Sequence, residues 1–300
     1  MKRIHIVNPA AGQGKCAELC RRYTQNGDTG YETQYAGDVA DSVKRLLSEE
    51  TDEVRICVYG GDGSVSEAVN GIMEADAGTR CVLTPVPGGT GNDFVRTLNE
   101  AEDGEHPADV IAVRGDSGVR YAVNMLNAGF DADVAAMISE LKKKPLISGS
   151  FAYIVGVVYR LCQRLGRPMK ISWVDENGES HTYEDDILLC AVGNARYCGG
   201  GFRAAPCADL SDGLLDLLIV KRVPRLRFLL LVKRYHDGTH IGPDGKPAKA
   251  FAPIMQYHQC RSVRMSGMKV FCRDGEISED ASVDITLIPS ALRCRSAKDL

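Results

Sequence analysis

The sequence has no run of about 18 apolar residues, the length that a membrane-spanning helix needs. It also lacks an N-terminal apolar segment followed by a small-residue cleavage site, which a secreted protein would carry. We therefore expect a cytoplasmic protein with no transmembrane segment. The formal net charge is only −4, so no excess of basic residues points to a nucleic-acid partner.

Cysteine pairs of the form C-x-x-C are absent although the chain has 11 cysteines, which argues against a zinc site. Most of the cysteines, such as Cys57, Cys81 and Cys190, lie in apolar runs and are expected to be reduced core residues. Internal repeats and low-complexity linkers are missing as well. A chain of 300 residues is longer than one core usually requires, so two domains are expected, divided near 120–127 where the pattern changes.

The stretch from Val54 to Phe94 repeats one arrangement, an apolar strand followed by a glycine-rich loop and the start of a helix. In the first copy the strand is 54–59, the loop GGDGS is 60–64, and the helix is 65–74. In the second copy the strand is 81–86, the loop PGGTGN is 87–92, and Asp93 begins a helix.

Both loops suit a phosphate group. Glycine removes the side chain that would keep a polyanion from the main chain, and the helix start offers unpaired N–H groups. Each loop also carries a carboxylate, Asp62 or Asp93, which would repel a phosphate unless Mg²⁺ lay between them. The pattern therefore predicts a Mg-nucleotide site, and the alternative is a pair of tight turns with aspartates as helix N-caps.

A third loop, NPAAGQGK at 8–15, follows the apolar strand 2–7. It departs from the Walker A motif at Pro9 and at Cys16, yet its glycines and Lys15 keep phosphate-binding chemistry. The spacing Gly12-x-Gly14-x-x-Ala17 matches a relaxed dinucleotide-binding fingerprint. A strand over 31–36 leads only to Gly37-Asp38, which resembles a helix N-cap more than a ribose-binding acid, so this alternative is weak.

Strands and helices alternate to about Val113, with a helix at 38–48 and a strand at 108–113, which predicts an α/β N-terminal domain with a parallel sheet. All three loops should lie at the carboxyl edge of that sheet. Helices are expected from Asp131 and over 150–165, and strands dominate beyond 170. The expected strands are 170–174, 187–193, 214–221, 261–265, 269–272 and 283–288. With only one further clear helix, 225–235, they predict a β-rich antiparallel sandwich or barrel.

Taken together, GGDGS, PGGTGNDF and NPAAGQGK resemble the diacylglycerol kinase catalytic-domain family, in particular its soluble bacterial lipid kinases. Two later segments also resemble blocks of that family, GGGFRAAPCADLSDGLLDLLIV at 199–220 and RDGEISEDASVDITLIPSALRC at 273–294. The resemblance implies an ATP-binding, NAD kinase-like α/β domain over 1–122, to which 288–300 returns, and a β-rich lipid-binding domain over 123–287. The connection between Phe94 and Asp109 is shorter than in relatives, so the sheet edge there is expected to differ.

The resemblance also implies roles for individual residues. Glu276 would be the general base, while Asp62 and Asp93 would organise the catalytic Mg²⁺ and complete the catalytic set. ATP would be held by Asn8, Pro9, Ala10, Ala11, Gly12, Lys15, Gly60, Gly61, Asp62, Gly63, Ser64, Val65, Ser66, Glu67, Thr90 and Asn92. A separate metal loop would use Asp209, Asp212 and Leu214. The alternatives are a hairpin turn with exposed acids at 274–276 and an acidic glycine turn without metal at 209–214.

The expected activity is an ATP- and Mg-dependent transfer of the γ-phosphate to the hydroxyl of diacylglycerol or a related lipid. An NAD kinase-like phosphotransferase and a catalytically silent nucleotide- or lipid-sensing module are the alternatives. The lipid partner requires transient contact with a membrane surface, for which basic residues at 142–144 and at Arg160, Arg164 and Arg167 could supply attraction. The sequence does not decide the oligomeric state, and a homodimer is kept as one alternative.

Overall fold

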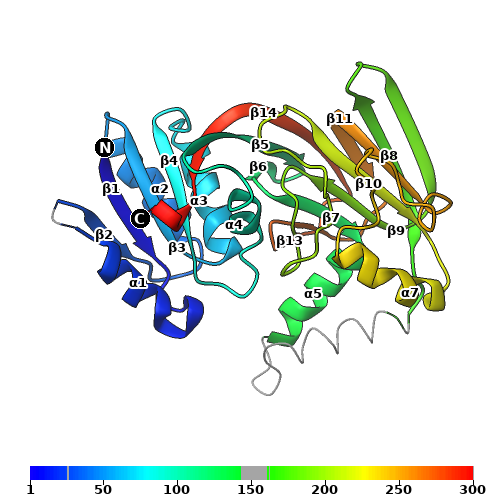
Figure 1. Cartoon of the computed structure of the whole chain (residues 1–300), viewed down its shortest axis with the longest axis horizontal. Coiled ribbons are helices and arrows are strands. Elements are labelled where there is room, and N and C mark those ends of the chain that lie inside the picture. Colours follow the sequence, from blue (N-terminus) through cyan, green and yellow to red (C-terminus); the bar gives the residue numbers. More distant parts are fainter. Residues whose placement is uncertain (26, 143–160, 162, 300) are drawn as a thin grey trace.

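The computed structural model describes residues 1–25, 27–142, 161 and 163–299. An N-terminal region of strands and helices lies beside a C-terminal region made mostly of strands, and the long last strand runs from one to the other (Figure 1). The predicted helix over 150–165 and the basic residues Lys143, Lys144 and Arg160 lie almost wholly outside the described residues. Among the described residues, no helix is both long enough and apolar enough to cross a membrane.

The N-terminal region contains a parallel sheet in the order β2-β1-β3-β4. Its strands are β1 (Lys2–Val7), β2 (Thr29–Glu32), β3 (Val54–Gly60) and β4 (Cys81–Pro87). Its helices are α1 (Lys15–Tyr23), α2 (Asp38–Glu49), α3 (Asp62–Glu74) and α4 (Asp93–Leu98), with a short 3-10 helix at Ala11–Gly14. The predicted α/β domain with parallel strands is confirmed.

Two local predictions in this region are wrong. The second strand is Thr29–Glu32 rather than 31–36, because the chain turns before α2: the backbone N–H of Gln34 donates to Asp38 Oδ2 at 2.7 Å. Helix α3 begins at Asp62, ahead of the predicted start at Val65, so most of the GGDGS loop is already the first turn of the helix. This places Asp62 itself at the positive end of the helix dipole.

The remaining strands form a β-rich part, which also takes in residues 105–122 that the sequence assigned to the α/β domain. They are β5 (Glu105–Gly115), β6 (Gly118–Ala122), β7 (Met125–Gly129), β8 (Arg167–Asp175), β9 (Ser180–Gly193), β10 (Leu215–Lys221), β11 (Met255–Ser266), β12 (Phe271–Arg273), β13 (Glu276–Ser278) and β14 (Ser282–Arg295). Pairing among β7 to β13 is antiparallel throughout. Among the described residues, the helices that accompany them are α5 (Phe130–Lys142) and α7 (Arg225–His236).

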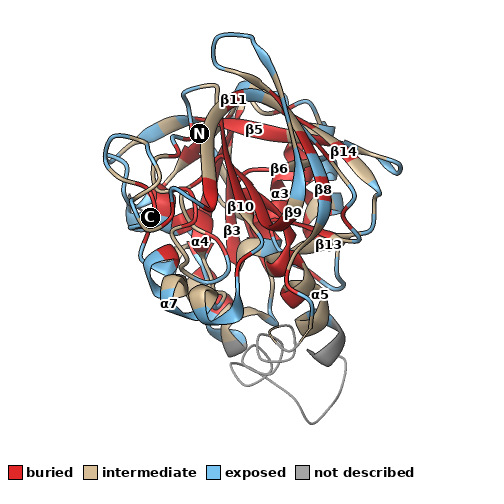
Figure 2. Cartoon of the chain, turned by 90° about the vertical axis from the view of Figure 1, so that its right-hand side faces the viewer, coloured by how far each residue is buried: buried red, intermediate tan, exposed pale blue. Residues whose placement is uncertain are grey.

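Strand β10 shows why this region packs in layers. Its side chains alternate in direction, so Leu217 and Ile219 belong to one apolar cluster while Leu218 and Val220 belong to another. Both faces of the strand are therefore covered, as the buried colour of β10 shows (Figure 2). A strand buried on both faces reads as a continuous apolar run, which is how LDLLIV appears in the sequence.

Strand β5 does not continue the parallel series as expected. It pairs antiparallel with β6 and with β14. The end of β14 pairs in parallel with β4 through Arg293 and Cys294. The chain thus returns to the first sheet by its last strand, and Leu292 joins the N-terminal core.

Asp109 of β5 joins three segments that lie far apart in the sequence. Its side chain is completely buried, and its two carboxylate oxygens accept hydrogen bonds from the backbone N–H groups of Gly213 at 2.8 Å and Ser290 at 2.7 Å. The backbone N–H of Asp109 also donates to the carbonyl of Leu210. A carboxylate suits this position because both partners are donors.

We expect Asp109→Asn to lower the free energy of unfolding by about 3 kcal/mol, because an amide offers one acceptor and places N–H groups against a second donor. Urea unfolding followed by circular dichroism would measure the change, with Asp103→Asn on the exposed loop before β5 as the control. A midpoint for Asp109→Asn within error of the control would show that the two bonds contribute little.

Candidate active site

Three glycine-rich loops meet at the carboxyl edge of the parallel sheet, after β1, β3 and β4. They touch through main chain: a Cβ atom on Gly12 would lie 2.7 Å from the carbonyl oxygen of Gly88, and one on Gly89 would lie 2.5 Å from the Cα of Gly61. The backbone N–H of Gly88 also donates to the carbonyl of Gly60 at 2.8 Å. The glycines are therefore required for the loops to approach each other, as well as for any ligand to approach them.

We expect Gly88→Ala to lower the free energy of unfolding by about 1–3 kcal/mol, because its Cβ would lie only 1.9 Å from Cys16 Sγ. Adding Cys16→Ala removes the sulfur and should restore part of that loss. Thermal unfolding of both variants and of Cys16→Ala alone would measure the coupling. Equal losses with and without the sulfur would contradict this origin of the strain.

Asn92 stabilises the loop 87–92 by bonding within it. Its side chain accepts a hydrogen bond from the N–H of Gly89 at 3.0 Å and donates to the carbonyl of Gly89 at 2.8 Å, and its backbone is left-handed at φ 54°. Asparagine tolerates that conformation better than most residues. Its amide is thus occupied within the loop, while the neighbouring Thr90 is exposed.

Asp62 and Asp93 lie beside each other where the loops 60–64 and 87–92 meet. Asp62 Oδ1 accepts hydrogen bonds from the N–H groups of Asp93 at 2.6 Å and Phe94 at 3.4 Å, so it caps α4 rather than its own helix. A Cβ on Gly91 would lie 2.5 Å from Asp62 Oδ2 and 3.4 Å from Asp93 Oδ2, so both carboxylates flank this glycine.

Asp93 is buried, at 4% exposure, and its Oδ2 accepts a hydrogen bond from the N–H of Gly200 at 2.8 Å. Its Oδ1 accepts no hydrogen bond within the described part of the chain, and the nearest cation is Arg96, whose Nε lies 3.8 Å away. Burial raises the pKa of Asp93, and the neighbouring charge of Asp62 raises it further. A divalent cation at this point would give the unpaired oxygen a partner and offset the repulsion between the two acids.

The other residues predicted to hold a nucleotide lie around this edge and differ in their exposure. Asn8 bridges two loops, since its Oδ1 accepts from the N–H of Ala10 at 3.1 Å and its Nδ2 donates to Ser64 Oγ at 3.4 Å. The accessible members are Pro9, Ala10, Ala11, Gly12, Lys15, Gly61, Gly63 and Thr90. The buried members are Gly60, Ser64, Val65 and Ser66.

The side chain of Glu67 accepts hydrogen bonds from the start of helix α2. Its two carboxylate oxygens accept hydrogen bonds from the N–H groups of Gly37 at 3.1 Å and Val39 at 3.3 Å, at the start of α2. Burial raises the pKa of Glu67, and the charge of Glu276 also raises it. Glu276, whose charge contributes to this rise, comes from the β-rich region of the chain.

Glu276 begins β13, directly across a two-residue turn from Arg273. The turn residues Asp274 and Gly275 have φ of 45° and 92°, the positive values that a tight hairpin turn uses. Arg273 is buried and its guanidinium forms an ion pair with Glu276, whose side chain is 41% exposed. The D-G hairpin is therefore present, and it presents an accessible carboxylate held by a buried cation.

Asp274 was not among the predicted site residues, yet it connects this hairpin to the segment between β6 and β7. Its carboxylate accepts hydrogen bonds from the N–H groups of Val123 at 2.8 Å, Asn124 at 3.2 Å and Met125 at 2.8 Å. Burial raises the pKa of Asp274 to about 6, although the three donors act in the opposite direction. The spacing R-D-G-E could have indicated the Arg273–Glu276 pair, whereas nothing local indicates the partners of Asp274.

The loop 209–214 gathers acids close to Asp109. Asp209 Oδ1 accepts from the N–H of Ser211 at 2.9 Å, and Asp212 Oδ1 accepts from the N–H of Leu214 at 2.9 Å. Behind the loop, burial raises the pKa of Asp216 to about 7, and the charge of Asp212 adds to it. Asp216 Oδ2 is buried without a hydrogen bond among the described residues, and an open pocket of about 430 Å³ lies beside Asp212 and Leu214.

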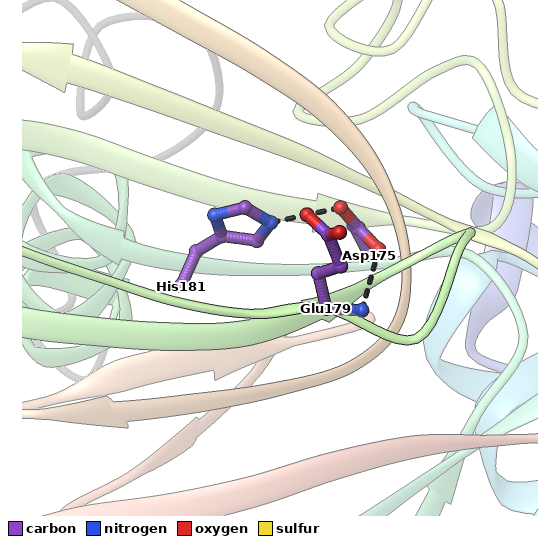
Figure 3. A group of neighbouring side chains, drawn as sticks. All are labelled: Asp175, Glu179 and His181. Atoms are coloured by element: carbon purple, nitrogen blue, oxygen red, sulfur yellow. Dashed lines mark hydrogen bonds and ion pairs between the residues drawn. The ribbon is translucent and has the colours of Figure 1, made fainter.

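A separate cluster of Asp175, Glu179 and His181 lies at the β8–β9 hairpin, with its possible ligand atoms within 4.8 Å of one another (Figure 3). Asp175 accepts hydrogen bonds from His181 Nε2 at 2.8 Å and from the N–H groups of Asn177 and Glu179, both at 2.9 Å. The His181 ring stacks on Trp173. These contacts close the hairpin turn, and the cluster belongs to strands other than those that carry the loops.

Two family models match consecutive parts of the chain. The model described as the diacylglycerol kinase catalytic domain matches residues 2–122, and the model described as the YegS C-terminal NAD kinase beta sandwich-like domain matches residues 124–295. Together they cover both regions described above. Their order agrees with the order of the segments that carry the sequence resemblance.

Proteins named as lipid kinases or diacylglycerol kinases also match most of the chain. The chain is 34% identical over 257 residues to a protein named probable lipid kinase YegS-like from Xanthomonas oryzae pv. oryzae, covering 81% of this chain and 79% of the relative. It is 29% identical over 282 residues to a diacylglycerol kinase from Staphylococcus carnosus, covering 89% and 86%. A crystal structure of a diacylglycerol kinase from Bacillus anthracis superimposes with a TM-score of 0.66 at 21% identity, covering 98% and 96%, which shows a shared fold.

Proposed function

Because this chain belongs to the diacylglycerol kinase catalytic domain family, and is a diacylglycerol kinase-like lipid kinase, we propose that it transfers the γ-phosphate of Mg-ATP to the hydroxyl of diacylglycerol or a close relative. Family membership implies the use of a nucleotide and a lipid. The identity of the nucleotide, the metal and the acceptor is our proposal. The observation that carries it is the pair Asp62 and Asp93, which meet at the edge where three glycine-rich loops converge.

The loops supply what a triphosphate needs. Phosphoryl transfer requires little covalent chemistry from a protein, since the main tasks are to hold the phosphates, neutralise their charge and position the acceptor. The start of α3 directs N–H groups to this edge, and Lys15 adds an accessible positive charge. In this proposal Asn8 and Asn92 act indirectly, by fixing the shape of their loops.

The oxygen atoms of the site are of the kind that bind Mg²⁺. Carboxylate oxygens are the ligands that Mg²⁺ prefers, and Asp93 Oδ1 is a buried acceptor without a hydrogen bond. When bound, the metal would polarise the transferring phosphoryl group and neutralise its charge. Asp62 would hold its position through its two bonds to the start of α4, while Asp93 would link the metal site to Gly200 in the β-rich region.

Glu276 is proposed as the group that accepts the proton of the lipid hydroxyl. An alcohol is a poor nucleophile at neutral pH, so a carboxylate within hydrogen-bond reach must take its proton as the new bond forms. Glu276 is accessible and comes from the β-rich region, and its charge is one of those that raise the pKa of Glu67 on α3. Asp62 is the less suitable acceptor, because its Oδ1 is already bound to two N–H donors.

The loop 209–214 is proposed as a second, structural Mg²⁺ site, using Asp212 with oxygen atoms of Asp209 and Leu214. The support is the accumulation of acids there, whose mutual repulsion a cation would offset. Its bond to Asp109 joins the loop to β5, which pairs with β14, the strand that runs from one region to the other. Its role would be to hold the two regions in register rather than to take part in the reaction.

The proposal is tested by incubating the purified protein with γ-labelled ATP, Mg²⁺ and one acceptor at a time in mixed micelles. We expect label in diacylglycerol or in a related lipid such as phosphatidylglycerol, ceramide or a sphingoid base. NAD is the matched non-lipid acceptor, because the C-terminal family model is named for its NAD kinase-like sandwich. Labelling of NAD alone would replace the proposal with NAD kinase-like transfer, and no transfer to any acceptor would favour a silent sensing module.

A further inference from the structure

Helix α7 exposes apolar side chains that the proposed reaction does not use. Leu226, Leu229 and Leu230 are 71%, 54% and 70% exposed, and they account for three of the five exposed large apolar side chains in the described part of the chain. Their spacing of three and four residues places them on one side of the helix. Exposed leucines in such a group mark an interaction surface more often than leucines scattered singly.

The opposite side of α7 is firmly packed. Phe228 lies against Phe130 with ring centroids 4.8 Å apart, and Tyr235 is buried against His240 at 4.8 Å. Leu231 joins the same apolar cluster. The helix is therefore anchored by one face, and the three leucines project from the other, along a surface coloured mostly exposed or intermediate (Figure 2).

The charges on α7 are all of one sign. Its sequence RLRFLLLVKRYH contains four basic side chains and no acidic one. Lys233, one turn beyond Leu229 and Leu230, is 83% exposed and pairs with Asp237 at 2.7 Å, a surface contact of small strength. Arg222, just before the helix, is also exposed and pairs with Asp186. Leucines bordered by cations on an exposed helix are the composition of helices that lie on anionic membranes.

The position of α7 connects this surface to the candidate active site. Phe130, which packs on Phe228, is the first residue of α5, and α5 contacts β12 and β13. Strand β13 begins with Glu276, the proposed proton acceptor. Figure 1 shows α5 and α7 side by side at the same end of the β-rich region. A bilayer bound by α7 would thus be linked through packed side chains to the hairpin that receives the lipid hydroxyl.

We propose that α7 docks this protein on an anionic lipid bilayer, with Leu226, Leu229 and Leu230 inserted below the head groups and the flanking cations contacting lipid phosphates. The partner is a membrane surface rather than a protein because the apolar patch is narrow, is bordered by positive charge and contains no acidic residue. The inference rests on the proposed function, since a kinase for a bilayer lipid must reach its substrate at that surface.

A gain of signal tests the docking without depending on loss of function. Trp173, the one tryptophan of the chain, is 6% exposed, so its emission should not respond to vesicles. In Leu230→Trp, an exposed indole would enter the bilayer. We expect a blue shift of roughly 10 nm with phosphatidylglycerol vesicles and quenching by brominated acyl chains. Emission that stays unchanged in vesicles that bind the protein would overturn the proposal.

Removing the exposed leucines of α7 is the complementary experiment to the tryptophan insertion. The triple variant Leu226→Gln, Leu229→Gln, Leu230→Gln keeps good helix formers at exposed positions and should fold normally. We expect its partition onto phosphatidylglycerol vesicles in sedimentation to fall about tenfold or more, with wild-type affinity for Mg-ATP. Tyr35→Gln, which removes an exposed aromatic residue from the other region, is the control and should bind vesicles normally.

The outcomes separate this inference from the proposed function. Normal vesicle binding by the triple variant of an active kinase overturns the docking surface and leaves the kinase intact. Lost vesicle binding with no phosphate transfer by the wild type supports the surface and contradicts the kinase. A wild-type dimer that the triple variant converts to monomer, with unchanged vesicle binding, assigns the leucines to a second copy of the chain. Raising the salt concentration should weaken vesicle binding, because the cations contribute.

Discussion

Asp62→Asn and Asp93→Asn are each expected to lower kcat/KM by about 10³-fold or more, because losing one acid that organises the metal should cost several kcal/mol. For Asp93 the physical reason is direct, since its buried Oδ1 accepts no hydrogen bond among the described residues. For Asp62 the change also replaces an acceptor that holds the start of α4. Initial rates at saturating Mg²⁺, together with Mg-ATP dissociation constants from calorimetry, measure both effects.

The control for these variants is an acid of similar kind outside the metal position. Asp76→Asn, in the turn after α3, should retain wild-type rates. Circular dichroism must show that each active-site variant is folded before its rate is interpreted. Activity of Asp62→Asn within about tenfold of wild type would remove this residue from the mechanism.

Glu276→Gln is expected to lower kcat about 10²-fold or more while leaving the affinity for Mg-ATP nearly unchanged, the effect of losing a general base. The glutamine keeps the shape of the side chain but cannot take a proton, and it leaves Arg273 buried without its ion pair. Asp62→Asn, in contrast, should weaken Mg-ATP binding as well. The comparison of kcat with the dissociation constant separates proton transfer from nucleotide binding.

A second variant separates the proton acceptor from its support. Arg273→Lys keeps a positive charge beside Glu276 but loses the planar guanidinium, so a modest fall in kcat is expected. A Glu276→Gln protein that binds Mg-ATP poorly but turns over normally at saturation would make Glu276 a nucleotide or metal residue. Asp62 would then be assigned as the group that accepts the proton of the lipid hydroxyl.

The parts of the site that the sequence predicted are those whose evidence is local. Strands β3 and β4, the two loops and the start of α4 each follow from a few consecutive residues, because apolar runs, glycines and a capping acid determine them directly. The meeting of the loops also follows, since neighbouring parallel strands end at one edge. The metal-binding roles of Asp62 and Asp93 came from the chemistry of their loops, and the role of Glu276 came from the resemblance. These roles remain predictions, as does the domain boundary at 122.

The parts that the sequence did not predict depend on distant partners. The bonds of Asp274 to Val123 and of Asp109 to Ser290 join residues 151 and 181 positions apart. Strand β5 reads as one more parallel strand until its partner β14 is known, because periodicity gives the faces of a strand and not its neighbour. The exposed side of α7 could not be distinguished from core either, since residues 228–232 are apolar on every side of the helix.

Transfer from ATP labelled in either the γ- or the α-phosphate, with Mg²⁺ and diacylglycerol micelles, tests the central claim most directly. The account predicts that label from γ-labelled ATP enters the organic phase as phosphorylated lipid, that α-labelled ATP gives none, and that Asp62→Asn reduces the signal to background. Label confined to the aqueous phase with wild-type protein, or transfer that persists in Asp62→Asn, would contradict it.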